Sequence, residues 1–489
     1  MRKLTLAAMA LVFVPLFTAA LNTQKAIPST QQASPEVMLK PCHIQGVKQE
    51  VRCGIYNVFE NRKTRKGRML PLKIVLLPAK RPHPNEGPIF YMAGGPGETA
   101  TELANLMIEF GDAEDHDVVL VDERGTGEGH RLDCRSSGSD DNVESYLNGP
   151  FDPVAARSCR DELEREYDLT QYSTPNFVED IDEVRRAMGY EKINLSAGSF
   201  GTYAALIYMR WHPDHVRTAY LKSLTPLSDR VPLYFPEAAQ QALDELFKEC
   251  EKDSQCYAAY PKSRDDFASL LEKLRTGPVL ASVRHPVTGA QTEVHLTERA
   301  FGDALRLMMY HNPYEIPFLL EQAKAGNFSP FAEEAVRVNR GIYSGGRMGL
   351  HYAITCNEFV SRIRPEEVEA ATRGTFLGSW RVRDQMEVCQ DWPKTELPAD
   401  YYEPFRLEMP TVVVSTEADP ASSSGRWDKE VTSTMPNAVH VTVSGVGHPT
   451  DNKCLRAIRH ALFRSGTTKN LDTNCVAKLQ RPPFKLRTH

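Results

Sequence analysis

Short apolar runs alternate with amphipathic stretches along much of the chain, and several of these runs end in glycine-rich turns. The runs Pro88–Met92, Asp117–Val121 and Lys192–Ser196 have strand character. Between the last two, apolar residues recur at helical spacing over roughly Asn176–Met188. Strands that alternate with helices predict an α/β protein with a mostly parallel sheet covered by helices.

The pattern changes in the middle of the chain. From about residue 226 to about residue 400 the sequence is charged and mostly helical in its periodicity, with few strand signals. Strand character returns at Thr411–Ser415 and Ala438–Val443. We therefore predict a sheet domain in two parts, 41–225 and 401–489, interrupted by a mainly helical cap over 226–400.

The N-terminus has the pattern of an export signal. Arg2 and Lys3 precede the almost wholly apolar run Leu4–Phe17, and small residues follow it. Because this run is shorter than the roughly 20 residues that span a bilayer, a cleaved signal peptide over 1–20 is favoured over a transmembrane anchor. No Cys follows the run to carry a lipid. A flexible lead-in is predicted over 21–40, and the exported chain is expected in the periplasm or the extracellular medium, without stable membrane association.

The charge balance excludes one class of partner. The formal net charge is −6, and charged residues of both signs are mixed along the chain. A nucleic-acid or anionic-lipid surface would need a basic stripe, so no nucleic-acid partner is expected. The sequence leaves the oligomeric state open.

Ten cysteines agree with an oxidising compartment. No two of them form a C-x-x-C pair, and no Cys/His cluster has zinc-finger spacing, so disulfides are favoured over a metal site. Sequence alone permits many connectivities. Their order along the chain suggests five local pairs: Cys42–Cys53, Cys134–Cys159, Cys250–Cys256, Cys356–Cys389 and Cys454–Cys475.

The segment Leu195–Thr202 lies between a predicted strand and a predicted helix and contains Ser199. This is the context of a nucleophile elbow, G-x-S-x-G, in which a tight turn lifts a serine hydroxyl above the sheet. Close packing requires small residues two positions before and after the serine, and these are Ala197 and Gly201. Ala197 departs from the usual glycine. Ser199 is the candidate nucleophile.

A serine hydroxyl needs a base, and the base needs a carboxylate to orient it. Asp419 and His448 follow the last two predicted strands, which gives the chain order Ser, Asp, His expected for this elbow. Alone, Asp419 reads as a turn residue before Pro420, and Glu417 is a rival carboxylate. Together the three residues predict a catalytic triad.

The glycine-rich turn Ala93–Gly97 follows another predicted strand. Glycines there allow the backbone to approach a substrate, and an N–H of this loop can pair with the N–H after the nucleophile. We assign the oxyanion hole to Gly95 and Phe200, with Gly94 as the alternative. A phosphate loop is disfavoured because the Lys-Ser/Thr of a Walker motif and the G-x-G-x-x-G fingerprint are missing. No metal or organic cofactor is required by this chemistry.

Two other motifs have a structural interpretation. The segment Asp122–Gly127 is expected to brace the base of the site through charge pairing. The segment His212–His215 has the form H-x-x-H, but it joins a predicted helix to a strand without a nearby third ligand. Metal binding there is not favoured.

Several segments together resemble the prolyl iminopeptidase and tripeptidyl aminopeptidase family of α/β-hydrolases. Ala93–Gly97 stands where many members have His-Gly-Gly-Pro-Gly, and Asp122–Gly127 is similar to the D-x-R-G-x-G stretch of the family. Ala197–Thr202 stands where Gly-Gly-Ser-Tyr-Gly or Gly-Gly-Ser-Trp-Gly is common. The tail segments Leu471–Cys475 and Arg481–Phe484 resemble the C-terminal module of secreted tripeptidyl aminopeptidases. The resemblance implies the α/β-hydrolase fold.

The resemblance to this family also implies a peptidase that releases proline or a short unit from a free peptide N-terminus. Such an enzyme must bind an ammonium group, and Glu358 stands where members have an acidic residue shortly after a cap cysteine. The Cys356–Cys389 bridge would hold Glu358 in place. Two alternatives remain: an esterase or lipase that uses the same triad, and a catalytically silent binding protein.

Overall fold

The computed structural model describes most of the chain after the N-terminal region. The predicted signal peptide, 1–20, and the lead-in up to residue 36 lie outside the described residues. The described residues are 37–134, 138–343, 347–422, 427, 433–445, 447–448 and 451–487.

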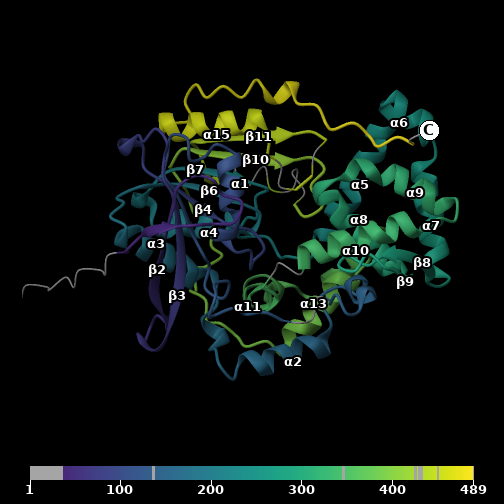
Figure 1. The fold of residues 1–489 in the computed structure, drawn as a ribbon, viewed down its shortest axis with the longest axis horizontal. Coiled ribbons are helices and arrows are strands. Elements are labelled where there is room, and N and C mark those ends of the chain that lie inside the picture. Colours follow the sequence, from purple (N-terminus) through teal and green to yellow (C-terminus); the bar gives the residue numbers. More distant parts are fainter. Residues whose placement is uncertain are drawn as a thin grey trace, which may run out of the picture. The chain divides into compact units, whose positions relative to one another are not determined.

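In this part of the chain, nine strands form one sheet (Figure 1) in the order β1-β2-β3-β5-β4-β6-β7-β10-β11. The first four strands of this order pair antiparallel, and all pairs from β5 to β11 are parallel. The mostly parallel sheet predicted from the pattern is confirmed. The strands are β1 (Lys40–Cys42), β2 (Val51–Asn61), β3 (Lys66–Leu77), β4 (Ile89–Met92), β5 (Val118–Val121), β6 (Ile193–Gly198), β7 (Val216–Lys222), β10 (Thr411–Thr416) and β11 (Ala438–Val443).

Helices cover both faces of the sheet, because both faces are apolar. Along β3, Ile74 faces one core cluster, whereas Val75 and Leu77 face another, as the two-residue period of a strand requires. Helices α3 (Thr174–Ala187) and α4 (Phe200–Trp211) pack in the first cluster. Helices α1 (Ala104–Glu109) and α15 (Lys453–Ser465) pack in the second.

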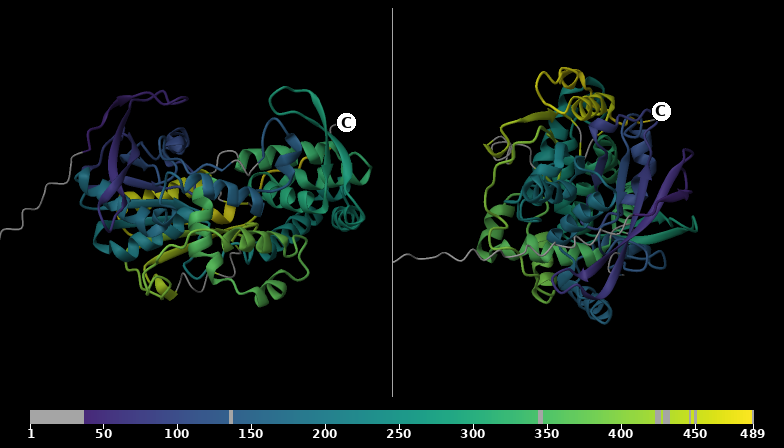
Figure 2. Two further views of the ribbon diagram at one scale, coloured as in Figure 1. Left: turned by 90° about the horizontal axis from the view of Figure 1, so that it is seen from below. Right: turned by 90° about the vertical axis from the view of Figure 1, so that its left-hand side faces the viewer.

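The predicted cap region is mostly helical, as expected, but it also contains a β-hairpin. Strands β8 (Val279–Arg284) and β9 (Gln291–Leu296) pair antiparallel and bury one face against the neighbouring helices. Figures 1 and 2 show the hairpin and helices α5 to α10 grouped beside the sheet. The helices are α5 (Phe235–Lys252), α6 (Ser254–Ala259), α7 (Ser263–Arg275), α8 (Glu298–His311), α9 (Ile316–Lys324), α10 (Ser329–Tyr343), α11 (Met348–Glu358), α12 (Pro365–Thr372) and α13 (Trp380–Gln390).

Helices α5 to α10 share a core of their own, which includes Phe267, Phe301 and Phe331. Helix α11 differs, because its buried side chains belong to the cluster under α3 and α4. The boundaries 226 and 400 of the predicted cap stay a prediction. The other helical elements among the fully described segments are α2 (Pro153–Leu163) and the 3-10 turns Pro84–Glu86, Ala100–Leu103, Val143–Leu147, Leu169–Gln171, Pro213–His215, Pro313–Glu315, Val360–Arg362 and Val476–Lys478.

Five disulfide bonds join the same cysteine pairs that their order along the chain suggested. The C-terminal segment adds a further link, since it runs from the sheet domain to the cap helices (Figure 1). There Phe484 packs against Tyr314, and Arg481 pairs with Glu249 and Asp253 of α5 and the residue after it. No helix among the described residues has the length and apolar character needed to cross a membrane.

Candidate active site

The predicted site residues lie at one edge of the sheet. Ser199 directly follows β6, Asp419 follows β10 and His448 follows β11, and these strands run parallel. The loop Ala93–Gly97 follows β4, which pairs parallel with β6. Because parallel strands end at the same edge, all four segments reach the side of the sheet where open α/β proteins bind ligands.

The backbone at Ser199 has φ 55° and ψ −131°, a conformation that non-glycine residues rarely adopt. Such a turn is typical of a nucleophile elbow. The neighbouring residues fit it: a Cβ on Gly201 would stand 2.2 Å from the Met92 carbonyl oxygen, so only glycine fits there. Ala197 is fully buried in β6, where its methyl group is accommodated.

Asp419 and His448 form a buried pair. The Asp419 Oδ2 atom lies 2.7 Å from His448 Nδ1, and the two residues are only 2% and 6% exposed. Burial tends to raise the pKa of Asp419, but His448 and the backbone N–H groups of Ala421 and Ser422 outweigh it and hold this pKa below its ordinary value. Asp419 is therefore a charged acceptor that can orient the imidazole.

Glu417, the rival carboxylate, is exposed to solvent, so Asp419 is the acid at His448. The Ser199 hydroxyl has no hydrogen-bond partner among the described residues. Catalytic serine–histidine contacts often tighten only when substrate binds.

The glycine-rich loop lies against the nucleophile. A Cβ on Gly94 would stand 3.4 Å from Ser199 Cβ. The Gly94 N–H donates to Glu98 Oε2 at 2.9 Å, whereas Gly95 is exposed in the loop. Phe200 opens α4, so its N–H lies in the first turn, where helix N–H groups lack a partner within the helix. This arrangement favours Gly95 over Gly94 as the loop donor, since the Gly94 N–H is already used.

Glu98 was not among the residues singled out from the sequence. A Cβ atom placed on Gly94 would lie 3.3 Å from Glu98 Oε2 and 3.4 Å from Ser199 Cβ. Glu98 and Ser199 therefore lie on either side of Gly94. The Glu98 side chain is exposed to solvent, yet desolvation by the surrounding protein raises its pKa, and His448 acts on it in the opposite direction. The only sequence signal was an acid directly after the glycine-rich turn.

Helix α8 of the cap contacts the loops of both the acid and the base. The ring of Tyr310 lies edge-on to His448, with 4.8 Å between the ring centroids. A Cβ on Gly447 would stand 2.2 Å from the Met309 carbonyl oxygen, so helix and loop are in close contact. Arg306 donates to the Pro420 carbonyl oxygen at 3.3 Å and also to the Tyr310 hydroxyl.

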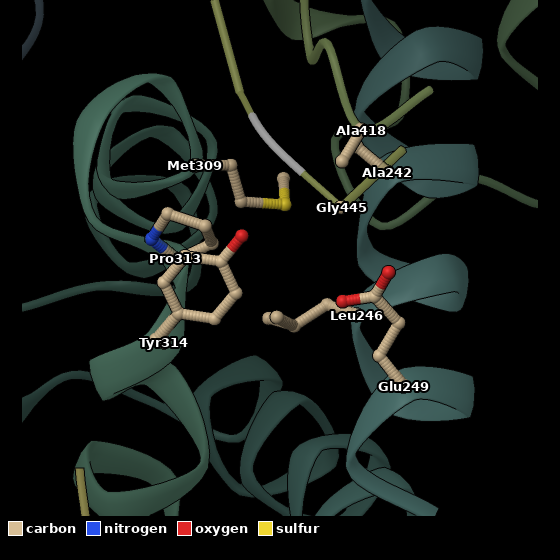
Figure 3. Close-up of a pocket in the computed structure, with 8 residues that line it drawn as sticks. All are labelled: Ala242, Leu246, Glu249, Met309, Pro313, Tyr314, Ala418 and Gly445. Atoms are coloured by element: carbon tan, nitrogen blue, oxygen red, sulfur yellow. The ribbon is translucent and has the colours of Figure 1, made fainter. Parts of the chain in front are cut away.

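A small cavity lies between α5 and the C-terminal end of α8, next to the loops that follow β10 and β11 (Figure 3). It has room for about one water molecule. The Tyr314 hydroxyl at this cavity is buried without a hydrogen-bond partner among the described residues. Its lining residues are Ala242, Leu246, Glu249, Met309, Pro313, Tyr314, Ala418 and Gly445.

Glu358, the predicted amine-binding residue, ends α11 and is fully buried. Its carboxylate accepts hydrogen bonds from the Thr174 N–H at 2.8 Å and the Tyr401 hydroxyl at 2.7 Å. Burial raises the pKa of Glu358 to about 7. Its amine-binding role stays a prediction, because both oxygens already have protein partners.

The segment Asp122–Gly127 contains a second buried acid. Burial first, and then the charge of Glu358, raise the pKa of Glu123 to about 8. Arg124 forms a fully buried bidentate pair with Asp180, with N–O distances of 2.7 and 2.8 Å. The charge pairing expected for this segment is therefore present between Arg124 and Asp180. The effect of Glu358 on Glu123 was not predicted from the sequence.

The H-x-x-H segment has ordinary partners. His212 contacts Glu179 at 3.1 Å, and its ring lies 6.3 Å from that of His215. Within the described ranges, no group of three or more His, Cys, Asp or Glu side chains could hold a metal ion.

Comparisons with known proteins agree with this architecture. Residues 87–285 match the family profile described as alpha/beta hydrolase fold, and residues 375–475 match the profile described as TAP-like protein. The first match contains the glycine-rich loop and Ser199, and the second contains Asp419 and His448.

Curated relatives match part of the chain. A tripeptidyl aminopeptidase of Streptomyces coelicolor is 29% identical over 167 residues, which are 30% of this chain and 30% of that protein. The serine protease Hip1 of Mycobacterium tuberculosis is 25% identical over 188 residues, 35% of this chain and 36% of that protein. The matched part is thus about a third of these relatives.

Among solved structures, a proline iminopeptidase of Mycobacterium smegmatis is similar with a TM-score of 0.40 and 14% identity, over 84% of this chain and 98% of that chain. The strand order, the elbow at Ser199 and the two profile matches lead to one assignment. The described part of this chain has the α/β-hydrolase fold, and residues 375–475 are similar to the TAP-like proteins.

Proposed function

We propose that this chain is an exported serine aminopeptidase that removes N-terminal proline or short units of two or three residues from peptides. The observation that carries the proposal is the buried Asp419–His448 pair at the sheet edge where the elbow presents Ser199. The similarity to a tripeptidyl aminopeptidase supports a peptide substrate. The partners are peptides with a free N-terminus.

In the first half of the reaction, His448 takes the proton of the Ser199 hydroxyl as its oxygen attacks the scissile carbonyl carbon. Asp419 accepts a hydrogen bond from Nδ1 of His448, which leaves Nε2 of the same ring to act as the base. The N–H groups of Gly95 and Phe200 stabilise the oxyanion. His448 then protonates the leaving amine, and an acyl-enzyme remains on Ser199.

In the second half, water attacks the acyl-enzyme while His448 again acts as base, and Ser199 is restored. Helix α8 lies against His448 and the Asp419 loop, so the cap stands over one side of the site. Such a cover favours short peptides over folded proteins. The five disulfide bonds support an oxidising compartment, the periplasm or the extracellular medium.

The test compares Pro-, Ala- and Ala-Ala-Pro-p-nitroanilides, each with a free and a blocked N-terminus, alongside a p-nitrophenyl ester. We expect the free amides to be cleaved much faster than the blocked ones, and a loss of about a million-fold in kcat in Ser199→Ala. Ester turnover without amide cleavage would refute the peptidase and leave an esterase. Failure of Ser199 to react with a fluorophosphonate probe would instead indicate a silent binding protein.

A further inference from the structure

We propose that Glu98 binds the α-ammonium group of the substrate directly beside the scissile carbonyl, so that this chain releases a single N-terminal residue. This inference rests on the proposed aminopeptidase function and narrows it. It concerns a carboxylate of the glycine-rich loop rather than one from the cap.

The position of Glu98 is fixed by the loop. Its Oε2 atom accepts the Gly94 N–H at 2.9 Å, and the Cβ position of Gly94 lies 3.3 Å from this oxygen and 3.4 Å from Ser199 Cβ. The carboxylate is therefore next to the nucleophile. Glu98 is exposed, which leaves it accessible to a ligand in the site.

The carboxylate lacks a cation of its own. No Lys, Arg or His nitrogen of the described residues lies within 4.0 Å of it. The charged groups that act on it are Glu102, which raises its pKa further, and His448, which lowers it. An unpaired carboxylate in a partly desolvated site is a strong binding point for a cation.

The charges that develop during the reaction also favour a substrate ammonium group as the ligand of Glu98. An oxyanion formed beside an ionised Glu98 would be repelled by it, because the two negative charges would lie close together. A substrate ammonium held by Glu98 would cancel the repulsion. The same carboxylate would disfavour a blocked N-terminus, which supplies no positive charge.

The covalent structure of a peptide then limits the length of the released unit. The α-nitrogen of the first residue is two bonds from its own carbonyl carbon, whereas the ammonium of a tripeptide unit is two residues further away, at about 3.3–3.6 Å per extended residue. A carboxylate that flanks Ser199 suits the first case. Glu358 is buried, and its two oxygens are occupied by Thr174 and Tyr401.

The test uses Glu98→Gln in the full chain, with Ala-p-nitroanilide, acetyl-Ala-p-nitroanilide and Ala-Ala-Pro-p-nitroanilide as substrates. Glutamine keeps an oxygen that can accept the Gly94 N–H but removes the charge. We expect kcat/KM for the free single-residue amide to fall by about 10- to 100-fold, the size of a lost charged hydrogen bond. Turnover of the acetylated amide should stay the same or rise. Glu128→Gln, which removes an exposed acid that is not among the groups acting on the pKa of Glu98, is the matched control and should leave the free-to-blocked ratio unchanged.

The rate of labelling by a neutral fluorophosphonate separates ammonium binding from a purely structural role, because this probe has no ammonium. An unchanged or faster rate in Glu98→Gln supports the proposal. Slower labelling with equal losses for free and blocked amides would show that Glu98 only supports the loop, and would overturn it. Wild-type preference for the tripeptide amide, or an unchanged free-to-blocked ratio in Glu98→Gln, would also overturn it while leaving the aminopeptidase intact. If the wild type cleaves only the ester, both proposals fall together.

Discussion

At the scale of single residues, Gly201 allows the nucleophile turn to form. A Cβ there would overlap the backbone oxygens of Met92 and Ala93 at 2.2 and 2.7 Å, and backbone atoms at the end of a core strand cannot easily move. We expect Gly201→Ala to lower the free energy of unfolding by about 1–3 kcal/mol, the usual cost of overpacking. It should also slow fluorophosphonate labelling of Ser199.

The control for this variant is Gly341→Ala in α10. Nothing lies within 4 Å of a Cβ at Gly341, and alanine is the better helix former by about 0.5–1 kcal/mol. Thermal unfolding should therefore show Gly341→Ala at or above the wild-type midpoint and Gly201→Ala below it. Equal midpoints would contradict the steric account of the elbow.

Asp419 orients His448 through one short contact, and an amide at this position would present a donor where a charged acceptor is needed. We expect Asp419→Asn to lower kcat by about 10,000-fold while the chain still folds. Glu417→Gln, on the same loop, should leave kcat unchanged, because Glu417 is exposed. Steady-state kinetics on the best amide or ester measures both, and a comparable loss in Glu417→Gln would return the rival carboxylate to consideration.

The candidate triad could be found from the sequence because each of its residues follows a strand and their order matches the fold. Glu98 could not be found in this way. Its place beside Ser199 depends on the fold-back of the loop, in which Gly95 and Gly97 have φ values of 108° and 103°. The amine-binding role of Glu358 stays a prediction, but its burial and its hydrogen bonds depend on distant segments that periodicity does not reveal.

At the scale of elements, α8 joins the cap to the catalytic loops. Arg306 is buried, contacts the Pro420 carbonyl and lies 4.2 Å from the Phe235 ring centroid of α5. Arg306→Ala would leave the Pro420 and Tyr310 oxygens without this donor, at about 1–3 kcal/mol. We expect a lower unfolding midpoint, and a reduced kcat as the loops of Asp419 and His448 lose their support.

Arg275→Ala is the matched control, because Arg275 pairs with Glu272 and Glu298 on the exposed surface of the cap, where such pairs contribute about 0–1 kcal/mol. Thermal unfolding and kcat should both stay near wild type. If Arg306→Ala behaves in the same way, α8 covers the loops without supporting them.

The strand–helix alternation of the sheet domain was strong enough to predict the fold class, since strands such as β5 and β10 are short apolar runs buried on both faces. The hairpin β8–β9 was missed, because it consists of two six-residue strands inside a long stretch of helical periodicity, and only alternate residues such as Ala281, Val283 and Val294 are buried. The core shared by α11 with α3 and α4 was missed for a different reason. A helix pattern shows that one face is apolar but not which distant helix covers it.

At the scale of the whole molecule, two buried acids come from segments far apart in the sequence, Glu123 from the loop after β5 and Glu358 from the end of α11. Their pKa values are raised to about 8 and about 7 from an ordinary 4.5, so the folded chain holds protons that the unfolded chain has released. Stability from these groups is therefore complete below about pH 4.5 and is lost as pH rises toward 8.

We expect Glu123→Gln to stabilise the chain relative to wild type, by little at pH 5 and by about 1–3 kcal/mol at pH 8.5, since one pKa unit corresponds to 1.36 kcal/mol. Buried histidines such as His130, whose pKa is lowered, add a slope of opposite sign. The difference between variants is thus the quantity to follow in urea unfolding at each pH. The exposed Glu128→Gln is the control, and a constant difference for Glu123→Gln would contradict the burial of this charge.

The order of the segments along the chain has a consequence for biosynthesis. Ser199 and the glycine-rich loop precede the cap, whereas β10 and β11, which hold the acid and the base beside β7, follow it. A polypeptide emerges N-terminus first. Ser199 is therefore synthesised long before its proposed base, and the proposed active site cannot be complete until His448 has been made.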